Sequence, residues 1–323
     1  MAAQIMAGAA LFSALGLNPT LGAVVLAIVV FIYCSISGMW GVMMTDSIQT
    51  VVIFFSTIAC IVFIAMSGGF DAMSAALPEA SFEFVPFSGE QLVMMLIPGA
   101  LNGLISGAAF QRTASCKDEK VAFFAPIIAA FALIPFVVMP VIIGMYGKAA
   151  FPDAPSASIL FEVVLKMNPI LAGLMVAAVL SAVMSTMDIG LLNVTANTVN
   201  DIYYKTLNPS ASQKALGRLS AIVTMVSGII ALALALTSSS ILSLLSQTYA
   251  LMNAGGLVMV VGGVLWKKGT KEGAIASAFC GMAMILLTKV GVNIPYIGFT
   301  SLIPAIIAYV AVSLATQKKT ANS

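Results

Sequence analysis

The stretch SAVMSTMDIGLLN, residues 181–193, ends a long apolar run and decides what kind of fold this chain adopts. The run is hydrophobic enough for lipid, yet its end carries two serines, a threonine and an aspartate. On a helix, Ala182, Ser185 and Thr186 share one face, and Asp188 lies along its edge. A carboxylate at the centre of a membrane helix costs roughly 3 kcal/mol on insertion scales. Such residues are retained mainly where they face a protein interior, water or an ion.

The composition is that of a polytopic, all-α membrane protein. Of the 323 residues, 61% are hydrophobic and only 8% are charged, whereas soluble domains carry about 25% charged residues. The chain has no basic run long enough to bind nucleic acid. It has no histidine, which excludes histidine-ligated metals and histidine proton relays. The scattered cysteines are interpreted as reduced packing residues because none has CxxC spacing. They are Cys34, Cys60, Cys116 and Cys280.

Length and hydropathy predict about ten transmembrane helices. The boundary between the second and the third rests on Gly38. The predicted spans are 2–17, 21–38, 39–68, 91–111, 120–147, 168–194, 213–237, 240–265, 272–290 and 296–316.

The basic residues are distributed asymmetrically about these spans. If the spans alternate, most of the 14 basic residues fall on one side, and only Lys148, Lys166 and Lys289 fall on the other. The positive-inside rule makes the first side cytoplasmic, so we expect a multi-pass protein of the cell membrane with a cytoplasmic C-terminus. The acidic loop 71–90 is then external.

Asp46 and Asp188 are the acidic residues that fall inside predicted spans. Each could face an ion pathway, or could be an aspartate that hydrates near the membrane surface. Beside Asp188, the Ser185 and Thr186 hydroxyls and a backbone carbonyl are plausible ligands for a hard cation. The same hydroxyls could instead bond back to the preceding helical turn or help helices to pack closely.

The span LIPGALNGLISGAAFQR, residues 96–112, is interrupted by one proline and several glycines. Such an interruption points to a transporter binding site, and Asn102 and Ser106 lie within it. Close helix packing through Gly99, Gly103 and Gly107 is the alternative. In the eighth span, Gln247 and Asn253 are further substrate candidates, for which a packing role is equally open.

Several motifs together resemble the sodium:solute symporter family, which includes proline, pantothenate, acetate, sialic-acid and sodium/glucose symporters. They follow one another in the family's order up to about residue 280. The motifs are GMWGVMMTDSIQ (38–49), FQRTASCKDEKVA (110–122), AAVLSAVMSTMDIGLLN (177–193), VNDIYY (199–204) and VLWKKGTKEGAIAS (264–277).

The resemblance implies a core of two inverted five-helix repeats, of the leucine-transporter type. Residues 1–70 then hold the last three helices of the first repeat, 91–265 hold the second repeat, and 266–323 hold two accessory helices and a short tail. It further implies that Ala182, Ser185 and Thr186 supply the eighth-helix ligands of a sodium site. Asp46 would lie on the inward route of the ion.

The expected function is sodium-coupled symport of a small organic solute by alternating access, with Na⁺ as the coupling ion, no other cofactor and no enzymatic activity. A membrane sensor module and an inactive or partial symporter are the alternatives. The resemblance implies that the first two core helices are not among these residues, so we expect the 323 residues alone not to perform coupled transport. The solute, the sodium stoichiometry and the oligomeric state stay open.

Overall fold

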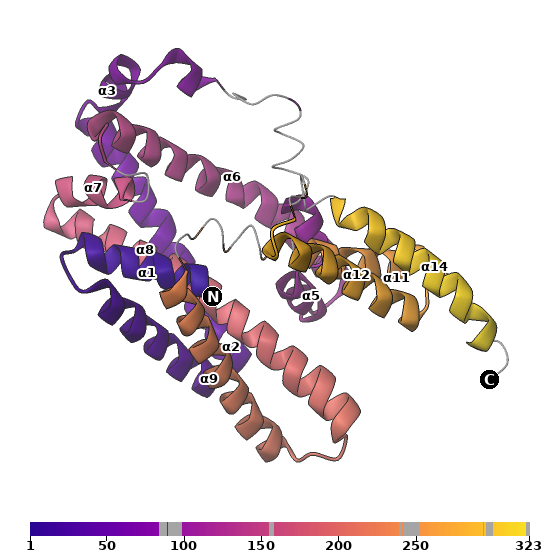
Figure 1. Cartoon of the computed structure of the whole chain (residues 1–323). Helices are drawn as coiled ribbons and strands as arrows, with labels where there is room; N and C mark the ends of the chain where they lie inside the picture. Colours follow the sequence, from indigo (N-terminus) through magenta and orange to yellow (C-terminus); the bar gives the residue numbers. More distant parts are fainter. Residues whose placement is uncertain are drawn as a thin grey trace. The chain divides into compact units, whose positions relative to one another are not determined.

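The computed structural model describes residues 1–83, 89, 99–154, 158–238, 241, 244, 248, 252–292, 294 and 300–320. Within these residues every regular element is a helix, as predicted for an all-α membrane protein (Figure 1). The chain divides into two compact units. Unit 1 comprises Met1–Phe84 with Lys117–Ile241, and unit 2 comprises Val85–Cys116 with Leu242–Ser323.

Unit 1 is organised around α8 (Pro169–Ala196), which packs on α1 (Ala2–Ala14), α2 (Pro19–Met66) and α9 (Gln213–Thr237). The Asn168 side chain caps the start of α8 by accepting hydrogen bonds from two backbone amides, ahead of a proline at the first helical position. The contacts between these helices are apolar. Their fully buried side chains include Ile5, Ala27, Val30, Met187 and Leu191.

The long helix α2 bends at Gly38, where φ is 58° and ψ is −160°. Side chains other than hydrogen clash with the backbone in this region, so glycine is the residue that occupies it readily. The bend separates two apolar segments of membrane-spanning length, Pro19–Ile36 and Trp40–Met66. The boundary that the sequence predicts between the second and third spans is therefore confirmed.

The rest of unit 1 adds α6 (Glu119–Ala150), α7 (Ile159–Lys166) and η2 (Asn197–Leu207), a π-helical continuation of α8. The predicted external loop 71–90 differs from a simple loop, because α3 (Gly69–Ala76) lies at its start and packs on α6. Gly69 at the start of α3 lies against the Tyr146 side chain of α6, and Met73 of the same helix is buried to 3% exposure.

In unit 2, residues 99–104 are helical. The helix is interrupted at Ile105 and Ser106, and α5 (Gly107–Ala114) follows. The predicted interruption of this span is therefore present. The other helices among the described residues of this unit are the π-helical η3 (Asn253–Leu257), α11 (Val258–Leu265), α12 (Lys271–Lys289) and α14 (Leu302–Thr320).

Among the described residues, five helical segments are long and apolar enough to cross a membrane, and each matches a predicted span. They are Pro19–Ile36, Trp40–Met66, Glu119–Ala150, Pro169–Leu207 and Gln213–Thr237. The shorter apolar helices Ala2–Ala14 and Leu302–Gln317 match the predicted first and last spans. The predicted spans 91–111 and 240–265 lie partly outside the described residues. The total of ten stays a prediction.

We expect Gly38→Ala to destabilise the protein by about 1–3 kcal/mol, because an alanine is strained at this combination of φ and ψ. The midpoint of thermal unfolding in detergent measures the effect. Gly144→Ala in α6 is the control, since a methyl group there meets no atom within 4 Å and the alanine favours the helix. An unchanged midpoint for Gly38→Ala would contradict the strain argument.

Candidate functional site

Three predicted ligand residues converge on one turn of α8. The Ser185 and Thr186 hydroxyls both donate hydrogen bonds to the Ala182 carbonyl, at 3.2 and 3.0 Å. Within unit 1, Ala182 and Thr186 are exposed and Ser185 is half-buried. Three oxygen atoms therefore lie together on a face of α8 that is open in this unit. This geometry suits both interpretations made from the sequence, cation ligation and hydroxyls that bond back along the helix.

Asp188 lies on the buried side of α8, with its residue at 0% exposure. Its Oδ1 accepts hydrogen bonds from the Tyr33 hydroxyl and from the Cys34 thiol, the latter at 3.5 Å. Its Oδ2 is buried and has no hydrogen-bond partner among the described residues. A buried carboxylate with one unsatisfied oxygen is costly, and it gains stability from a cation.

Tyr33 and Cys34 are hydrogen-bond donors to Asp188 that the sequence analysis missed. Both lie in the first segment of α2, inside an otherwise apolar run. A tyrosine at membrane depth is the one signal that could have found the pair, because its hydroxyl needs a partner when buried. Cys34 is reduced and buried, as predicted for a packing residue, and it also donates to the carboxylate.

Asp46 lies on the second segment of α2 and is half-buried. It is close enough to Asp188 for the two charges to interact. Two neighbouring carboxylates repel one another, and a cation between them or bound to either reduces that repulsion. The structure thus brings the two predicted intramembrane carboxylates into one neighbourhood.

A cavity of about 220 Å³, with several polar residues in its lining, lies beside Cys34, between α2, the end of α8 with η2, and α9. It is bordered by the bend at Gly38 and by Asn200 of the π-helical segment. The Thr195 and Thr224 hydroxyls at its wall are hydrogen-bonded to each other at 2.9 Å. The sequence analysis did not foresee this cavity, since its lining comes from three separate helices.

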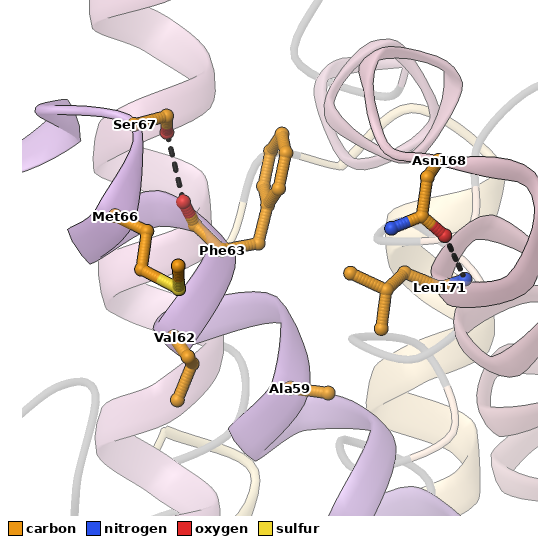
Figure 2. Close-up of a pocket in the computed structure, with 7 residues that line it drawn as sticks. All are labelled: Ala59, Val62, Phe63, Met66, Ser67, Asn168 and Leu171. Carbon is orange, nitrogen blue, oxygen red and sulfur yellow. Dashed lines mark hydrogen bonds between the residues drawn. The ribbon is translucent and has the colours of Figure 1, made fainter.

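A second pocket of unit 1, of about 440 Å³, lies between the far end of α2 and the start of α8 (Figure 2). Its polar groups serve the backbone: the Ser67 hydroxyl donates to the Phe63 carbonyl at 2.9 Å, and Asn168 caps α8. What remains is an apolar lining that includes Phe63 and Leu171. The predicted ion-site residues do not line this pocket.

The described substrate candidates lie in unit 2. The Asn102 side-chain amide lies 3.9 Å from the Met252 sulfur. Met252 directly precedes Asn253, which is fully buried at the start of η3. The Ser106 hydroxyl accepts a hydrogen bond from the Ala109 amide at 3.4 Å, which caps α5. Gln247 lies outside the described residues. The interrupted helix and the π-helical η3 therefore meet through Asn102 and Met252.

The fold and this site define a helical membrane protein with a candidate cation site on its central packed helix, α8. The sequence pattern of the sodium:solute symporter family matches residues 1–281, and the chain belongs to this family. The chain is 27% identical to the sodium/pantothenate symporter of Haemophilus influenzae, over 95% of this chain and 66% of that protein. It is also 27% identical to the sodium/proline symporter of Escherichia coli, over 95% of this chain and 64% of that protein.

A solved structure shares the fold. It is described as the substrate-bound outward-open state of a Na⁺-coupled sialic acid symporter. Its TM-score is 0.76 at 20% sequence identity, and the match covers 97% of this chain and 70% of that chain. The present chain spans about two thirds of the length of the two curated relatives. These relatives are named as symporters and not as enzymes.

We expect Tyr33→Phe to lower the free energy of unfolding by about 1.5–3 kcal/mol, because the buried carboxylate of Asp188 loses a donor. Thermal unfolding of the single variants and of the double variant Tyr33→Phe/Asp188→Asn forms a double-mutant cycle. The double variant should lose much less stability than the sum of the singles. Tyr204→Phe, at an exposed position, is the control. Additive losses would show that Tyr33 and Asp188 are not coupled.

Proposed function

We propose that this chain forms part of a sodium-coupled symporter that moves a small organic solute into the cell by alternating access. One observation carries the proposal: Ala182, Ser185 and Thr186 converge on α8 in a chain whose family is that of the sodium:solute symporters. The relatives named as sodium/proline and sodium/pantothenate symporters support the coupling ion and the type of solute.

Sodium is a hard cation that takes several oxygen ligands. The Ala182 carbonyl and the hydroxyls of Ser185 and Thr186 supply three such oxygens. In the free chain the hydroxyls donate to the carbonyl, and on binding they would turn their lone pairs to the ion. The other ligands come from a second element facing α8, which the family resemblance expects to be the first core helix.

Asp46 and Asp188 belong to the ion pathway in this proposal. Asp188 is one short turn beyond Ser185 on α8, and the charge of Asp46 interacts with it. The pair gives the region a negative potential that favours a passing cation. The excess of basic residues supports a cytoplasmic location for this end of α8 and for the C-terminus.

The solute would bind at the broken helix and η3 in unit 2, near Asn102, Ser106 and Asn253. Gln247, which lies outside the described residues, is a further candidate. Interrupted helices supply polar backbone groups to a ligand within the membrane. One Na⁺ that moves inward across a potential of 100 mV supplies about 2.3 kcal/mol for solute accumulation. Sodium couples to the solute if it binds the outward-open state more tightly than the inward-open state.

We expect Ser185→Ala and Thr186→Ala each to raise the half-saturating sodium concentration about tenfold, because each variant removes one ligand. Binding of radioactive Na⁺ to purified protein measures this. The assay uses this chain and, in parallel, a chimaera in which the N-terminal helices of a sodium/proline symporter precede it. Ser227→Ala in α9 is the matched control, since its hydroxyl bonds back to the Val223 carbonyl in the same way.

Parental sodium affinity in both ligand variants of a chimaera that binds sodium would refute the assignment. A loss of affinity in Ser227→Ala of similar size would show that back-bonding hydroxyls act through helix stability.

We expect Asp46→Asn to slow sodium-driven uptake about tenfold or more while leaving membrane insertion intact, because it removes a charge at nearly constant shape. The chimaera is reconstituted in liposomes with an imposed sodium gradient and is offered labelled proline, pantothenate and sialic acid. Asp201→Asn is the control, since this aspartate is exposed and pairs with Lys205. An unchanged rate at every sodium concentration would leave Asp46 as an interfacial aspartate only.

A further inference from the structure

A groove of about 360 Å³ runs between α11 and α14 in unit 2, starting at Leu257, the last residue of η3. Asn102, Ser106 and Asn253, the described solute candidates, do not line it. Its lining is apolar and aromatic, and includes Val258, Val261, Trp266, Ile306, Tyr309 and Val310. The rim is open, since Ile306 is 49% exposed and Val310 is 36% exposed. In hydrocarbon such a groove is a surface for alkyl chains.

Tyr309 connects the floor of this groove to the turn that follows α11. It is 4% exposed, and its ring centroid lies 5.6 Å from that of Trp266. Two glycines allow this close approach. A methyl group on Gly262 would come within 2.6 Å of the Tyr309 ring, and one on Gly269 within 2.0 Å of its hydroxyl. The phenol end of the groove therefore lies at the turn formed by residues 266–271.

That turn is held on α14 by hydrogen bonds. The Gln317 side-chain amide donates to the Lys268 carbonyl at 2.6 Å. The Thr270 amide donates to the Ser313 hydroxyl at 3.2 Å, and the Thr270 and Thr316 hydroxyls lie 2.8 Å apart. The turn therefore has a fixed position at the end of the groove.

The pinned turn presents positive charge. Lys267, Lys268 and Lys271 are all exposed, while Glu272, also exposed, offsets one of the three charges. Tryptophan, tyrosine and lysine together are typical of the membrane–water interface, and clustered lysines attract anionic headgroups. An apolar groove that ends at a fixed cationic turn matches the two halves of an anionic phospholipid.

We propose that this groove is a binding site for one anionic phospholipid of the surrounding bilayer. An acyl chain lies along Val261, Ile306 and Val310, and the phosphate lies at Lys267 and Lys268. The aromatic pair Trp266 and Tyr309 lies between these two regions, at the level of the glycerol backbone. The charge of the turn selects the headgroup, and the apolar groove holds the chain.

Fluorescence quenching tests the site directly, because the chain has only two tryptophans, Trp40 and Trp266. Trp40 is 75% exposed, so Trp40→Phe leaves Trp266 as the only tryptophan. This variant of the full chain is reconstituted in phosphatidylcholine vesicles. The probes are phosphatidylglycerol and phosphatidylcholine with brominated acyl chains, which quench tryptophan on contact.

We expect phosphatidylglycerol to quench Trp266 with an association constant roughly fivefold or more above that of phosphatidylcholine, about the effect of one lysine at the membrane surface. High salt should abolish this preference in the same protein, without any variant that affects folding. Lys267→Gln/Lys268→Gln should also abolish it. Lys214→Gln, an exposed lysine at the start of α9, should leave it unchanged. Val310→Phe should weaken quenching by both lipids, because it fills the groove.

Equal quenching by the two lipids in the parent would overturn the headgroup assignment. Absence of quenching by both would show that protein covers the groove, either another helix or a second copy of the chain, and would overturn the site itself. A preference that survives high salt and the double lysine variant would place the anionic site elsewhere.

Discussion

Hydrocarbon offers no hydrogen-bond partner to a backbone amide or carbonyl, and the rest of this structure depends on that constraint. The described chain is therefore built from helices, because a helix satisfies its backbone hydrogen bonds within the segment. Departures from helix are therefore few, and three of them border the candidate sites. The bend at Gly38 and the π-helical η2 border the cavity beside Cys34. The break at Ile105 and Ser106 lies at the substrate candidates.

The polar side chains of α8 also need hydrogen-bond partners, and they lie on two different faces of the helix. The hydroxyls occupy one face and the carboxylate occupies the other. Ser185 and Thr186 bond to a carbonyl of their own helix, so they can face an open side without loss. Asp188 instead turns to the buried side, where Tyr33 and Cys34 of α2 donate hydrogen bonds to it. A hydroxyl face that is free to exchange partners beside a carboxylate that is anchored suits a site that binds and releases an ion.

In unit 2, a turn outside the helices also has its polar groups hydrogen-bonded. The turn at residues 266–271 leaves the helix geometry, and its backbone and side chains find partners on α14. Its lysines are then free to face an anionic surface. The proposed lipid site and the proposed sodium site use residues of different helices, so lipid binding and sodium binding can be measured separately.

The sequence by itself determined the all-α membrane class, the boundary between two spans at Gly38, the interruption near Ser106 and the shared face of Ala182, Ser185 and Thr186. These follow from composition, glycine chemistry and helical period, which act over a few neighbouring residues. Only the tertiary structure decided that Asp188 turns to Tyr33 and Cys34, that Asp46 lies in its neighbourhood, and that Tyr309 meets Gly262 and Gly269. These contacts join residues far apart in the chain, and they depend on which helices pack together. The hydropathy of the sequence does not predict which helices pack together, because apolar contacts are not directional.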